Sequence, residues 1–269
     1  MARLLVTGGS GYLGAELVRT AERQGWEVEA TTFSQPGRRL DVRDSDAVER
    51  LVHDLRPDAV VHTAYLQEGP DAWAVTVDGA GNVARAAAGT RLVHLSTDVV
   101  FDGLRPRRYV EGDEQTPVTD YGRAKAEAEH RVARAHPEAL VVRTSMLYGG
   151  DGASKHELLA LRAADGETDV TFFTDELRCP IVVGDLARAL LELLSLDVSG
   201  PLHVAGADTV SRHEFARRVA AANGRDPERV RGAPSHVPRP LNCALDSNRA
   251  AQMIETRLRG VREVLPLLP

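Results

Sequence analysis

The sequence is poor in cysteine. Cys179 and Cys243 are its only thiols among 269 residues. Two thiols are too few for the disulfide framework of a small secreted protein, and these two are too isolated to suggest a zinc site. Because cytosolic proteins keep their thiols reduced, we expect both cysteines to be free and the protein to be cytoplasmic.

Long apolar runs and an excess of positive charge are missing as well. No apolar stretch approaches the roughly 20 residues that cross a bilayer, and the N-terminus runs from an apolar stretch straight into glycines, without a signal-peptide cleavage site. The formal net charge of -6 gives no electrostatic reason to expect nucleic acid or an anionic membrane as a partner. With 43% hydrophobic and 27% charged residues, the composition is that of a globular chain.

Lysine is the third rarity. The chain has 33 lysines and arginines together, and only Lys125 and Lys155 are lysines. One of the two lies four residues after Tyr121, in the stretch "DYGRAK" (120–125). Almost all positively charged side chains of this protein are arginines. A lysine four residues after a tyrosine therefore suggests that position 125 requires an amine.

Short apolar stretches alternate with helical patterns over the first part of the chain. This alternation is typical of a parallel sheet covered by helices on both faces. It predicts a doubly wound α/β domain over residues 1–150. We predict strands at 3–7, 27–33, 58–64, 91–97 and 139–148, and helices at 14–25, 44–57, 71–89 and 120–136.

After residue 150 the pattern becomes less regular and mostly helical. We predict a smaller substrate-binding lobe over residues 151–269, of which a part at about 180–200 packs back on the first domain. In this architecture, ligands sit outside the carboxyl ends of the strands, where a second lobe can close over them. Helical patterns occur at 155–164, 183–196, 211–224 and in the last turns around 247–265, while the proline-containing stretch 232–242 is irregular.

The stretch "VTGGSGYLGAEL" (6–17) places Gly8, Gly11 and Gly14 between the first predicted strand and the first helix. In a dinucleotide-binding turn, the first glycine permits the tight turn, the second lets the backbone approach the pyrophosphate, and the third lets helix pack on strand. The helix N-terminus then offers free amide donors to the phosphates. This order of strand, glycines and helix favours a nucleotide site over an ordinary turn.

The end of the second predicted strand indicates which dinucleotide binds. NAD sites usually carry Asp or Glu about 20 residues after the glycines, where it holds the ribose hydroxyls. This chain has Thr31, Thr32 and Ser34 there instead, followed by Arg38 and Arg39. We therefore predict NADP(H) in preference to NAD(H), with Ser34, Arg38 and Arg39 at the 2'-phosphate; the alternative is that both arginines are solvated loop charges. Asp41 and Val42 are predicted to line the adenine pocket.

Tyr121 and Lys125 lie four residues apart in a predicted helix and hence on the same face. A free tyrosine has a pKa of about 10. An ammonium beside it would stabilise the phenolate and lower that pKa, so that Tyr121 can exchange protons near neutral pH. Lysine suits the position because its compact charge on a flexible stem can also reach ribose hydroxyls. Thr97 ends the preceding strand, where its hydroxyl can hold a substrate carbonyl oxygen.

Together, these motifs resemble a known family. The glycine loop, "STDVVFDG" (96–103), "YGRAK" (121–125) and "RTSMLYG" (143–149) are similar to those of the extended short-chain dehydrogenase/reductases. The resemblance is greatest to the dTDP-4-dehydrorhamnose reductase family, and "RCPIVVGDLARAL" (178–190) extends it into the C-terminal third. It implies a Rossmann fold and an NADPH-dependent reduction of a ketone in a small-molecule substrate, a dTDP-linked 4-keto-6-deoxysugar.

The resemblance also implies residue roles. Thr97 would orient the carbonyl, Tyr121 would protonate the forming alkoxide, and Lys125 would tune Tyr121 and hold the nicotinamide ribose. Arg178 and Arg239 are candidates for the substrate diphosphate, as is the basic stretch "RPRRY" (105–109), whose alternative is a solvated loop. Further predicted substrate contacts are Asp98, Val99 and Met146, and further predicted cofactor contacts are Tyr12, Leu13, Thr63, Ala64 and Thr144.

The chain departs from this family on the substrate side. Val99 and Met146 stand where the family usually has Tyr and Trp, Thr76 stands where it has Asn, and the loop "AYLQEGP" (64–70) is about two residues shorter. The cofactor chemistry therefore carries over better than the substrate. Some relatives bind magnesium at a dimer contact through several glutamates, of which only Glu16 is present, so no metal is predicted and a homodimer is left open.

Two alternatives follow from these departures. Val99 and Met146 could reshape the pocket for a non-nucleotide carbonyl substrate. The same fold and the "STD…FDG" motif also occur in the regulatory beta subunit of methionine adenosyltransferase, so a non-catalytic, NADP-binding regulatory subunit is the other alternative. The complete set of Thr97, Tyr121 and Lys125 argues against the regulatory subunit.

Overall fold

One parallel sheet forms the centre of the molecule. In the computed structural model, which describes residues 1–267, its strands are β1 (Arg3–Thr7), β2 (Glu27–Thr32), β3 (Arg38–Arg39), β4 (Ala59–His62), β5 (Arg91–Thr97), β6 (Leu140–Thr144) and β11 (Gly200–His203). Their order is β11-β6-β5-β4-β1-β2-β3, and every neighbouring pair is parallel. The order reverses between β1 and β4, which is the switch point of a doubly wound sheet. The predicted fold class is confirmed.

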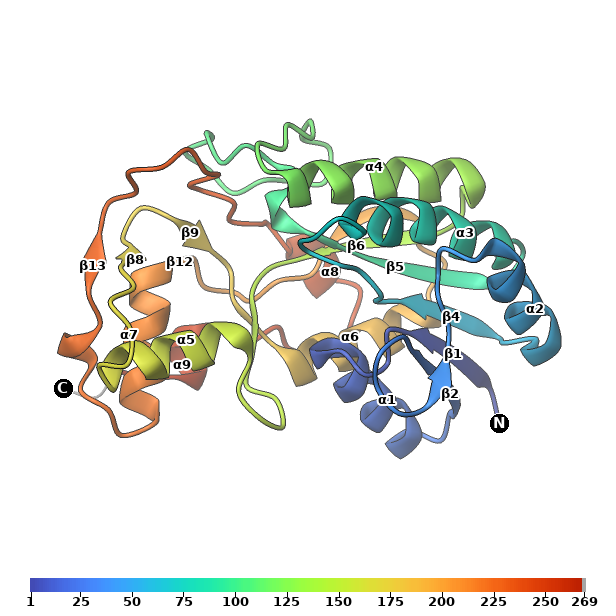
Figure 1. Ribbon diagram of the computed structural model, residues 1–269, viewed down its shortest axis with the longest axis horizontal. Helices are drawn as coiled ribbons and strands as arrows, with labels where there is room; N and C mark the ends of the chain where they lie inside the picture. The colour runs from blue at the N-terminus through green and yellow to red at the C-terminus, as the bar shows by residue number, and fades with distance from the viewer. Residues whose placement is uncertain (268–269) are drawn as a thin grey trace.

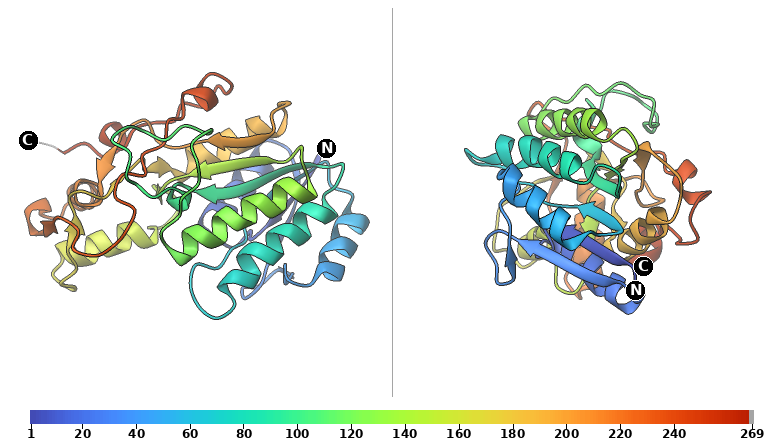
Figure 2. Two further views of the ribbon diagram at one scale, coloured as in Figure 1. Left: turned by 90° about the horizontal axis from the view of Figure 1, so that it is seen from above. Right: turned by 90° about the vertical axis from the view of Figure 1, so that its right-hand side faces the viewer.

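Helices cover both faces of this sheet (Figure 1, Figure 2). One face carries α1 (Tyr12–Arg23) and α6 (Val183–Leu194), and the other carries α2 (Ser45–Leu55), α3 (Gly79–Ala86) and α4 (Asp120–Ala135). Strand residues alternate between the two layers. In β1, Leu4 and Val6 pack with α1, whereas Leu5 packs with α2 and α3. Because both faces are buried, the strands are continuous apolar stretches, and each fully buried leucine contributes about 1.5–3 kcal/mol.

The chain returns to this sheet long after residue 150. Helix α6 shares an apolar cluster with α1, and β11 pairs with β6 through Pro201 opposite Val141 and Leu202 opposite Val142. The segment predicted to pack back, about 180–200, contains α6. The division into 1–150 and 151–269 stays a prediction, and its residues 268–269 lie outside the described part of the chain.

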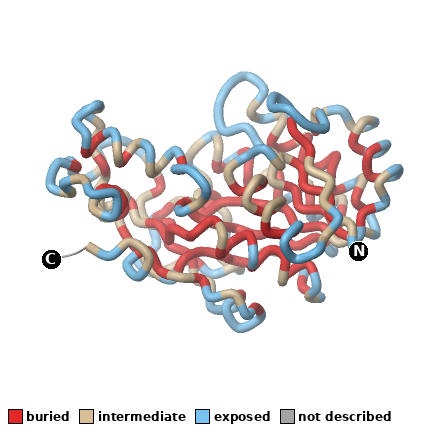
Figure 3. The backbone as a smooth tube through the Cα atoms, turned by 90° about the horizontal axis from the view of Figure 1, so that it is seen from below, coloured by how far each residue is buried: buried red, intermediate tan, exposed pale blue. Residues whose placement is uncertain are grey.

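A smaller lobe stands at the carboxyl ends of the strands (Figure 1). Its helices α5 (Lys155–Ala164) and α7 (Arg212–Ala222) share an apolar cluster with Tyr148 and Phe215. Ser154 and Ser211 cap these two helices by accepting a hydrogen bond from the backbone amide three residues on. Figure 3 shows buried backbone running from the sheet into this lobe.

The remaining elements are short, and they account for most differences from the sequence predictions. The predicted helix 71–89 begins as one π-helical segment, η1, and continues as α3. Gly79, the first residue of α3, packs against Val42 so closely that a Cβ would lie 2.5 Å from its Cγ2. The predicted strand 139–148 breaks after β6. None of the helices within residues 1–267 has the length and apolarity needed to cross a membrane. The short elements are η1 (Ala74–Asp78), η2 (Asp98–Val100), β7 (Leu147–Tyr148), β8 (Phe172–Phe173), β9 (Leu177–Arg178), β10 (Ile181–Val182), β12 (Val210–Ser211), η3 (Pro227–Arg229), β13 (Gly232–Ala233), α8 (Asn248–Ala251) and α9 (Val261–Val264).

Candidate active site

A cavity of about 640 Å³ opens at the carboxyl ends of the strands, between the sheet and the lobe. It is lined by the glycine loop, by the ends of β4 and β5, by the first turns of α4 and α5, and by Arg212 at the start of α7. This is the place where a doubly wound sheet binds its ligands. Another hollow, of about 440 Å³ between α2 and α3, contains none of the predicted site residues.

The glycine loop has the geometry that a pyrophosphate site requires. Gly8 has a φ of 77°, a left-handed conformation that favours glycine. A Cβ on Gly14 would lie 2.2 Å from the carbonyl oxygen of Gly8, so only glycine lets α1 approach β1 this closely. Gly11 is the N-cap of α1, and with Tyr12, Leu13 and Gly14 it lines the cavity. The backbone amides at this end of α1 therefore face the space where phosphates are expected.

The hydroxyl of Tyr12 connects this loop to the lobe. It accepts a hydrogen bond from the amide of Gly150 at 2.8 Å and donates one to Glu157 of α5 at 3.4 Å. Glu157 also completes the capping box of α5 with Ser154. The first helical residue after the phosphate loop is thus tied to the start of the lobe's first helix.

The predicted 2'-phosphate residues lie outside the cavity, on the exposed end of β2 and on β3. Ser34, Arg38 and Arg39 are all exposed. Arg38 lies 3.5 Å from Glu29, whereas the guanidinium of Arg39 lies 5.1 Å from the centroid of the Phe33 ring. Arg39 has no carboxylate within 4.0 Å among residues 1–267, which leaves it the freer of the two arginines for a phosphate.

The predicted adenine residues differ in their availability. Asp41 accepts hydrogen bonds from the Arg43 side chain, at 2.8 Å from Nη2, and these bonds lower the pKa of Asp41. Val42 is buried in the apolar cluster of α2 and α3. The side chain of Val42 therefore packs in the core, and its role as a wall of the adenine pocket stays a prediction. Of the other predicted cofactor contacts, Thr63 and Thr144 line the cavity, and Ala64 lies against Gly8.

The three predicted catalytic residues line the same cavity. Thr97 ends β5, and its hydroxyl accepts a hydrogen bond from the amide of Val99. Tyr121 lies in the first turn of α4, which is capped by Thr119. Gly122, the residue after Tyr121, packs against Val99 so closely that a Cβ would lie 2.3 Å from the carbonyl oxygen of Val99. This contact sets α4 beside the end of β5 and brings Tyr121 to Thr97.

Lys125 is buried one helical turn beyond Tyr121, with 3% of its surface exposed. Its Nζ donates a hydrogen bond to the carbonyl of Leu95 at 2.8 Å and lies 4.8 Å from the centroid of the Tyr65 ring. Burial lowers the pKa of Lys125 to about 8, and the carboxylate of Glu129 opposes this effect. At neutral pH the side chain is therefore still mostly an ammonium.

The predicted net lowering of the pKa of Tyr121 is not found in the structure. Burial raises the pKa of Tyr121 above its ordinary value, the charges of Tyr65 and Asp98 raise it further, and a hydrogen bond with Thr97 lowers it. Burial is the largest of these effects. The ammonium of Lys125, one helical turn away, contacts the carbonyl of Leu95 and the ring of Tyr65. Tyr121 therefore keeps its proton at neutral pH, which is the state that a proton donor needs.

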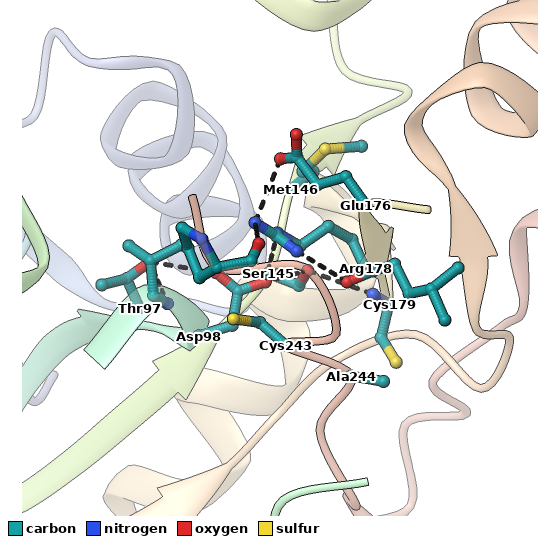
Figure 4. Close-up of polar contacts among 12 residues, drawn as sticks. Thr97, Asp98, Ser145, Met146, Glu176, Arg178, Cys179, Cys243 and Ala244 are labelled. Atoms are coloured by element: carbon teal, nitrogen blue, oxygen red, sulfur yellow. Dashed lines mark hydrogen bonds and ion pairs between the residues drawn. The ribbon is translucent and has the colours of Figure 1, made fainter. Parts of the chain in front are cut away.

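Asp98 lies beside Thr97 in a buried cluster (Figure 4). It accepts hydrogen bonds from Ser145 Oγ at 2.6 Å and from Thr97 Oγ1 at 3.2 Å. Burial raises the pKa of Asp98, although Arg178 and the two hydroxyls lower it. Ser145 in turn accepts from the amide of Cys179, so that the ends of β5 and β6 and the strand β9 are held together around this carboxylate.

Glu176 holds the two arginines that the sequence assigned to the substrate diphosphate. Its carboxylate lies 3.0 Å from Arg178 and 2.9 Å from Arg239. Arg178 is buried and also donates to three backbone carbonyls, those of Leu177, Pro240 and Leu241. Both arginines line the cavity, but their charge is already balanced by the protein. Their role toward a diphosphate stays a prediction.

The comparisons with known proteins bear on the whole chain. The RmlD substrate binding domain family matches residues 2–268. A dTDP-4-dehydrorhamnose reductase of Mycolicibacterium smegmatis is 41% identical over 281 aligned residues, which cover 98% of this chain and 84% of the relative. The chain belongs to the RmlD substrate binding domain family.

Further RmlD-type proteins agree in sequence and in structure. A dTDP-4-dehydrorhamnose reductase of Mycobacterium tuberculosis is 38% identical, with 98% of this chain and 91% of the relative covered. The crystal structure of dTDP-4-dehydrorhamnose reductase from Bacillus anthracis in complex with NADP superposes with a TM-score of 0.86 at 26% identity, covering 98% of both chains. The likeness thus includes the lobe as well as the sheet.

The cavity of this RmlD-family chain also contains residues that the sequence did not single out. Tyr65 contacts both Tyr121 and Lys125, with ring centroids 5.7 Å apart in the first case. Lys155, His156 and Arg212 line the lobe side together with Met146 and Val99. The rarity of lysine was a signal for Lys155, whereas nothing in the sequence distinguishes Arg212 from the many other arginines.

Three other sequence expectations have clear outcomes. The residues of "RPRRY" are not among those that line the cavity; Arg105 and Arg107 both pair with Asp113, at 2.9 and 2.8 Å, whereas Tyr109 is buried, so that only the arginines fit the solvated-loop alternative. Thr76 is buried and bonds to both backbone groups of Leu66, which shapes the short loop. Both cysteines are free and buried.

Two histidines of the central sheet, His62 and His94, are buried. His62 and His94 stack with ring centroids 5.2 Å apart. His62 Nδ1 lies 2.6 Å from Thr7 Oγ1, while His62 Nε2 and both nitrogens of His94 have no partner in the described part of the chain. Burial lowers the pKa of His62 to about 3 and that of His94 well below its ordinary value.

Proposed function

We propose that this chain is an NADPH-dependent reductase that acts on the ketone of a dTDP-linked 4-keto-6-deoxysugar. The observation that carries the proposal is the single cavity that joins the glycine loop to Thr97, Tyr121 and Lys125. The family membership supports the substrate class, because relatives that cover nearly the whole chain are dTDP-4-dehydrorhamnose reductases.

The residues present fit NADP(H). The turn at Gly8 and the close packing at Gly14 leave room for a pyrophosphate at the start of α1, and Arg39 offers a guanidinium without a carboxylate partner near the expected 2'-phosphate. Thr63 and Thr144 would line the nicotinamide side. When bound, NADPH supplies the hydride.

The chain's own residues supply orientation and the proton. The hydroxyls of Thr97 and Tyr121 would hold the carbonyl oxygen, and Tyr121 would give that oxygen its phenolic proton as the ketone carbon accepts a hydride. The raised pKa of Tyr121 keeps the proton in place until then. Lys125, mostly protonated below its pKa of about 8, stabilises the phenolate left behind. The products are an alcohol and a tyrosinate that recovers its proton from solvent.

The decisive test follows NADPH and NADH oxidation over a panel of dTDP-4-keto-6-deoxysugars, with non-nucleotide ketones in parallel. We expect turnover with NADPH on a nucleotide sugar, and a loss of about 10²–10⁴-fold in Tyr121→Phe with NADPH binding retained. Tyr148→Phe is the matched control, because the buried hydroxyl of Tyr148 has no partner among the described residues. Turnover on non-nucleotide ketones alone would select the alternative substrate, and indifference of the protein's activity to Tyr121→Phe would select the regulatory subunit.

The cellular location and the oligomeric state of the protein are also proposals. We propose a cytoplasmic protein, supported by its two free thiols, and the homodimer left open by the sequence is tested by light scattering of the purified chain. The division into a cofactor domain and a substrate lobe is supported by the cavity between them.

A further inference from the structure

The basic residues on the lobe side of the cavity are not equally balanced by carboxylates. Arg178 and Arg239 share Glu176, at 3.0 and 2.9 Å. Arg212 and Lys155 line the same cavity, and among residues 1–267 neither has a carboxylate oxygen within 4.0 Å. The lobe therefore presents two side-chain cations whose charge the protein itself does not balance.

Arg212 has a notably weak partner for its guanidinium. Its Nη1 donates to the thioether sulfur of Met146 at 2.8 Å, and a thioether is a weak acceptor. Burial lowers the pKa of Arg212, and the neighbouring Arg178 lowers it too, although Glu176 raises it. An anion that enters the cavity would therefore stabilise the charged guanidinium of Arg212.

Lys155 approaches the same region from α5. Its ammonium contacts the side-chain amide oxygen of Gln67, a neutral acceptor in the loop that follows β4. Burial lowers the pKa of Lys155, and the charge of Arg212 lowers it further, whereas Glu68 raises it. Lys155 and Arg212 therefore line one cavity, and the charge of Arg212 reaches Lys155.

The backbone adds to this positive potential. Lys155 and Arg212 are the first residues of α5 and α7, which pack against each other. The positive ends of both helix dipoles therefore lie at this wall of the cavity. His156 beside them is neutral, because burial lowers its pKa to about 3, and it can serve only as a hydrogen-bonding group.

The position of this wall relative to the catalytic residues suits a sugar linked to phosphate. Thr97 donates a hydrogen bond to Asp98, which accepts another from Ser145. Met146 follows Ser145 in the chain, and its sulfur accepts a hydrogen bond from Arg212. Tyr121, Met146 and the two unbalanced cations thus line one cavity. In a pyranose with a 4-ketone, the anomeric oxygen that bears the diphosphate is on the side of the ring opposite the ketone.

We propose that Arg212 and Lys155 bind the diphosphate of a nucleoside-diphosphate-linked substrate, in place of the arginines that the sequence suggested. The inference rests on the proposed function for the identity of the sugar, but the diphosphate site itself does not. Arg178 and Arg239 then shape the cavity through Glu176, while the two cations without carboxylate partners receive the negative charge.

The test measures binding of dTDP to the full-length protein with NADPH present, by calorimetry, in Arg212→Met, Lys155→Met and Arg212→Lys. The dissociation constant should rise by about tenfold or more in each Met variant, as for a lost charge-assisted hydrogen bond, with a partial recovery in Arg212→Lys. Thymidine, which lacks the charge, should bind these variants and the unaltered protein alike. Arg162→Met is the matched control, because Arg162 lies on α5 outside the cavity and pairs with Glu167 at 3.6 Å.

The outcomes separate this inference from the proposed function. Unchanged dTDP binding in both Met variants overturns the inference, as does an equal loss of thymidine binding, which would indicate damage to the fold. If the unaltered protein reduces no keto-sugar but its dTDP binding depends on Arg212 and Lys155, the diphosphate site stands and the proposed reaction fails. If keto-sugar turnover is present and KM for it is unchanged in both variants, the reaction stands and the diphosphate site fails.

Discussion

The ammonium of Lys125 lies 4.8 Å from the centroid of the Tyr65 ring. The same ring packs against that of Tyr121, with centroids 5.7 Å apart and planes inclined by 43°. An aromatic side chain from the loop after β4 therefore covers the cation on which the proposed chemistry depends. A contact of this kind favours the charged form of lysine, but the ring also excludes water, and burial is the larger effect on the pKa of Lys125.

Replacing Tyr65 by alanine should raise the pKa of Lys125 from about 8 toward its ordinary value of 10.5, because water then reaches the ammonium. The high-pH decline of kcat/KM should move to higher pH in Tyr65→Ala. In Tyr65→Phe, which keeps the ring, it should stay in place. A pH profile of the alanine variant that coincides with that of the unaltered protein would show that Tyr65 does not control this group.

Replacing Lys125 by methionine should abolish turnover and yet stabilise the fold at neutral pH. The folded-state pKa of Lys125, about 8, lies below the ordinary value of 10.5. The unfolded chain therefore binds this proton more tightly, and the buried ammonium lowers the free energy of unfolding below about pH 8. After the lost hydrogen bond to Leu95 is subtracted, Lys125→Met should raise the free energy of unfolding at pH 7 by about 2 kcal/mol. The gain should fade between pH 8 and pH 10, as urea unfolding at both pH values would show; a less stable variant at pH 7 contradicts the burial argument.

The buried pair of His62 and His94 should make the fold sensitive to acid. Their pKa values are lowered by burial, to about 3 for His62 and well below 6.5 for His94. The unfolded chain therefore takes up protons as the pH falls through 6.5 while the folded chain does not, and stability is lost by about 1.4 kcal/mol per pH unit for each imidazole. His94→Phe should show a smaller loss between pH 7 and pH 5, by about 2 kcal/mol.

The control for this acid effect is His130→Ala, because His130 is exposed on α4. Its unfolding free energy should run parallel to that of the unaltered protein over the same pH range. Parallel curves for His94→Phe would mean that His94 is not held neutral in the folded state.

Arg39 should decide the preference for NADPH over NADH. Because its guanidinium stacks on Phe33 and has no carboxylate partner, Arg39→Ala should raise KM for NADPH by about tenfold or more and leave KM for NADH unchanged. Arg38→Ala should have a smaller effect, since Arg38 lies 3.5 Å from Glu29. Equal effects of Arg39→Ala on both cofactors would place the 2'-phosphate elsewhere.

Local patterns explain what the sequence could predict. Gly8, Gly11 and Gly14 have their roles within one turn between a strand and a helix, and the four-residue spacing of Tyr121 and Lys125 places them on one face of α4 whatever surrounds it. Alternation of apolar stretches was likewise enough to predict the parallel sheet, because each strand is buried on both faces.

What failed depends on contacts between distant parts of the chain. The pKa of Tyr121 rises because the fold buries it against Tyr65, and spacing along one helix says nothing about that burial. Arg178 and Arg212 are both arginines in the C-terminal third, and only the tertiary structure shows that Glu176 pairs with the first. The π-helical start of the helix predicted at 71–89 is likewise seen only in the structure.

Because β11 pairs with β6, residues 1–150 alone do not contain the whole central sheet, and we expect them not to fold as an independent domain. A truncation after residue 150 would remove β11 from the side of β6. It would also remove α6, whose apolar surface packs against α1. The fragment would display an unpaired strand border of the kind that recruits other chains into aggregates. Grafting a different lobe onto this sheet therefore requires the donor to bring its own closing strand.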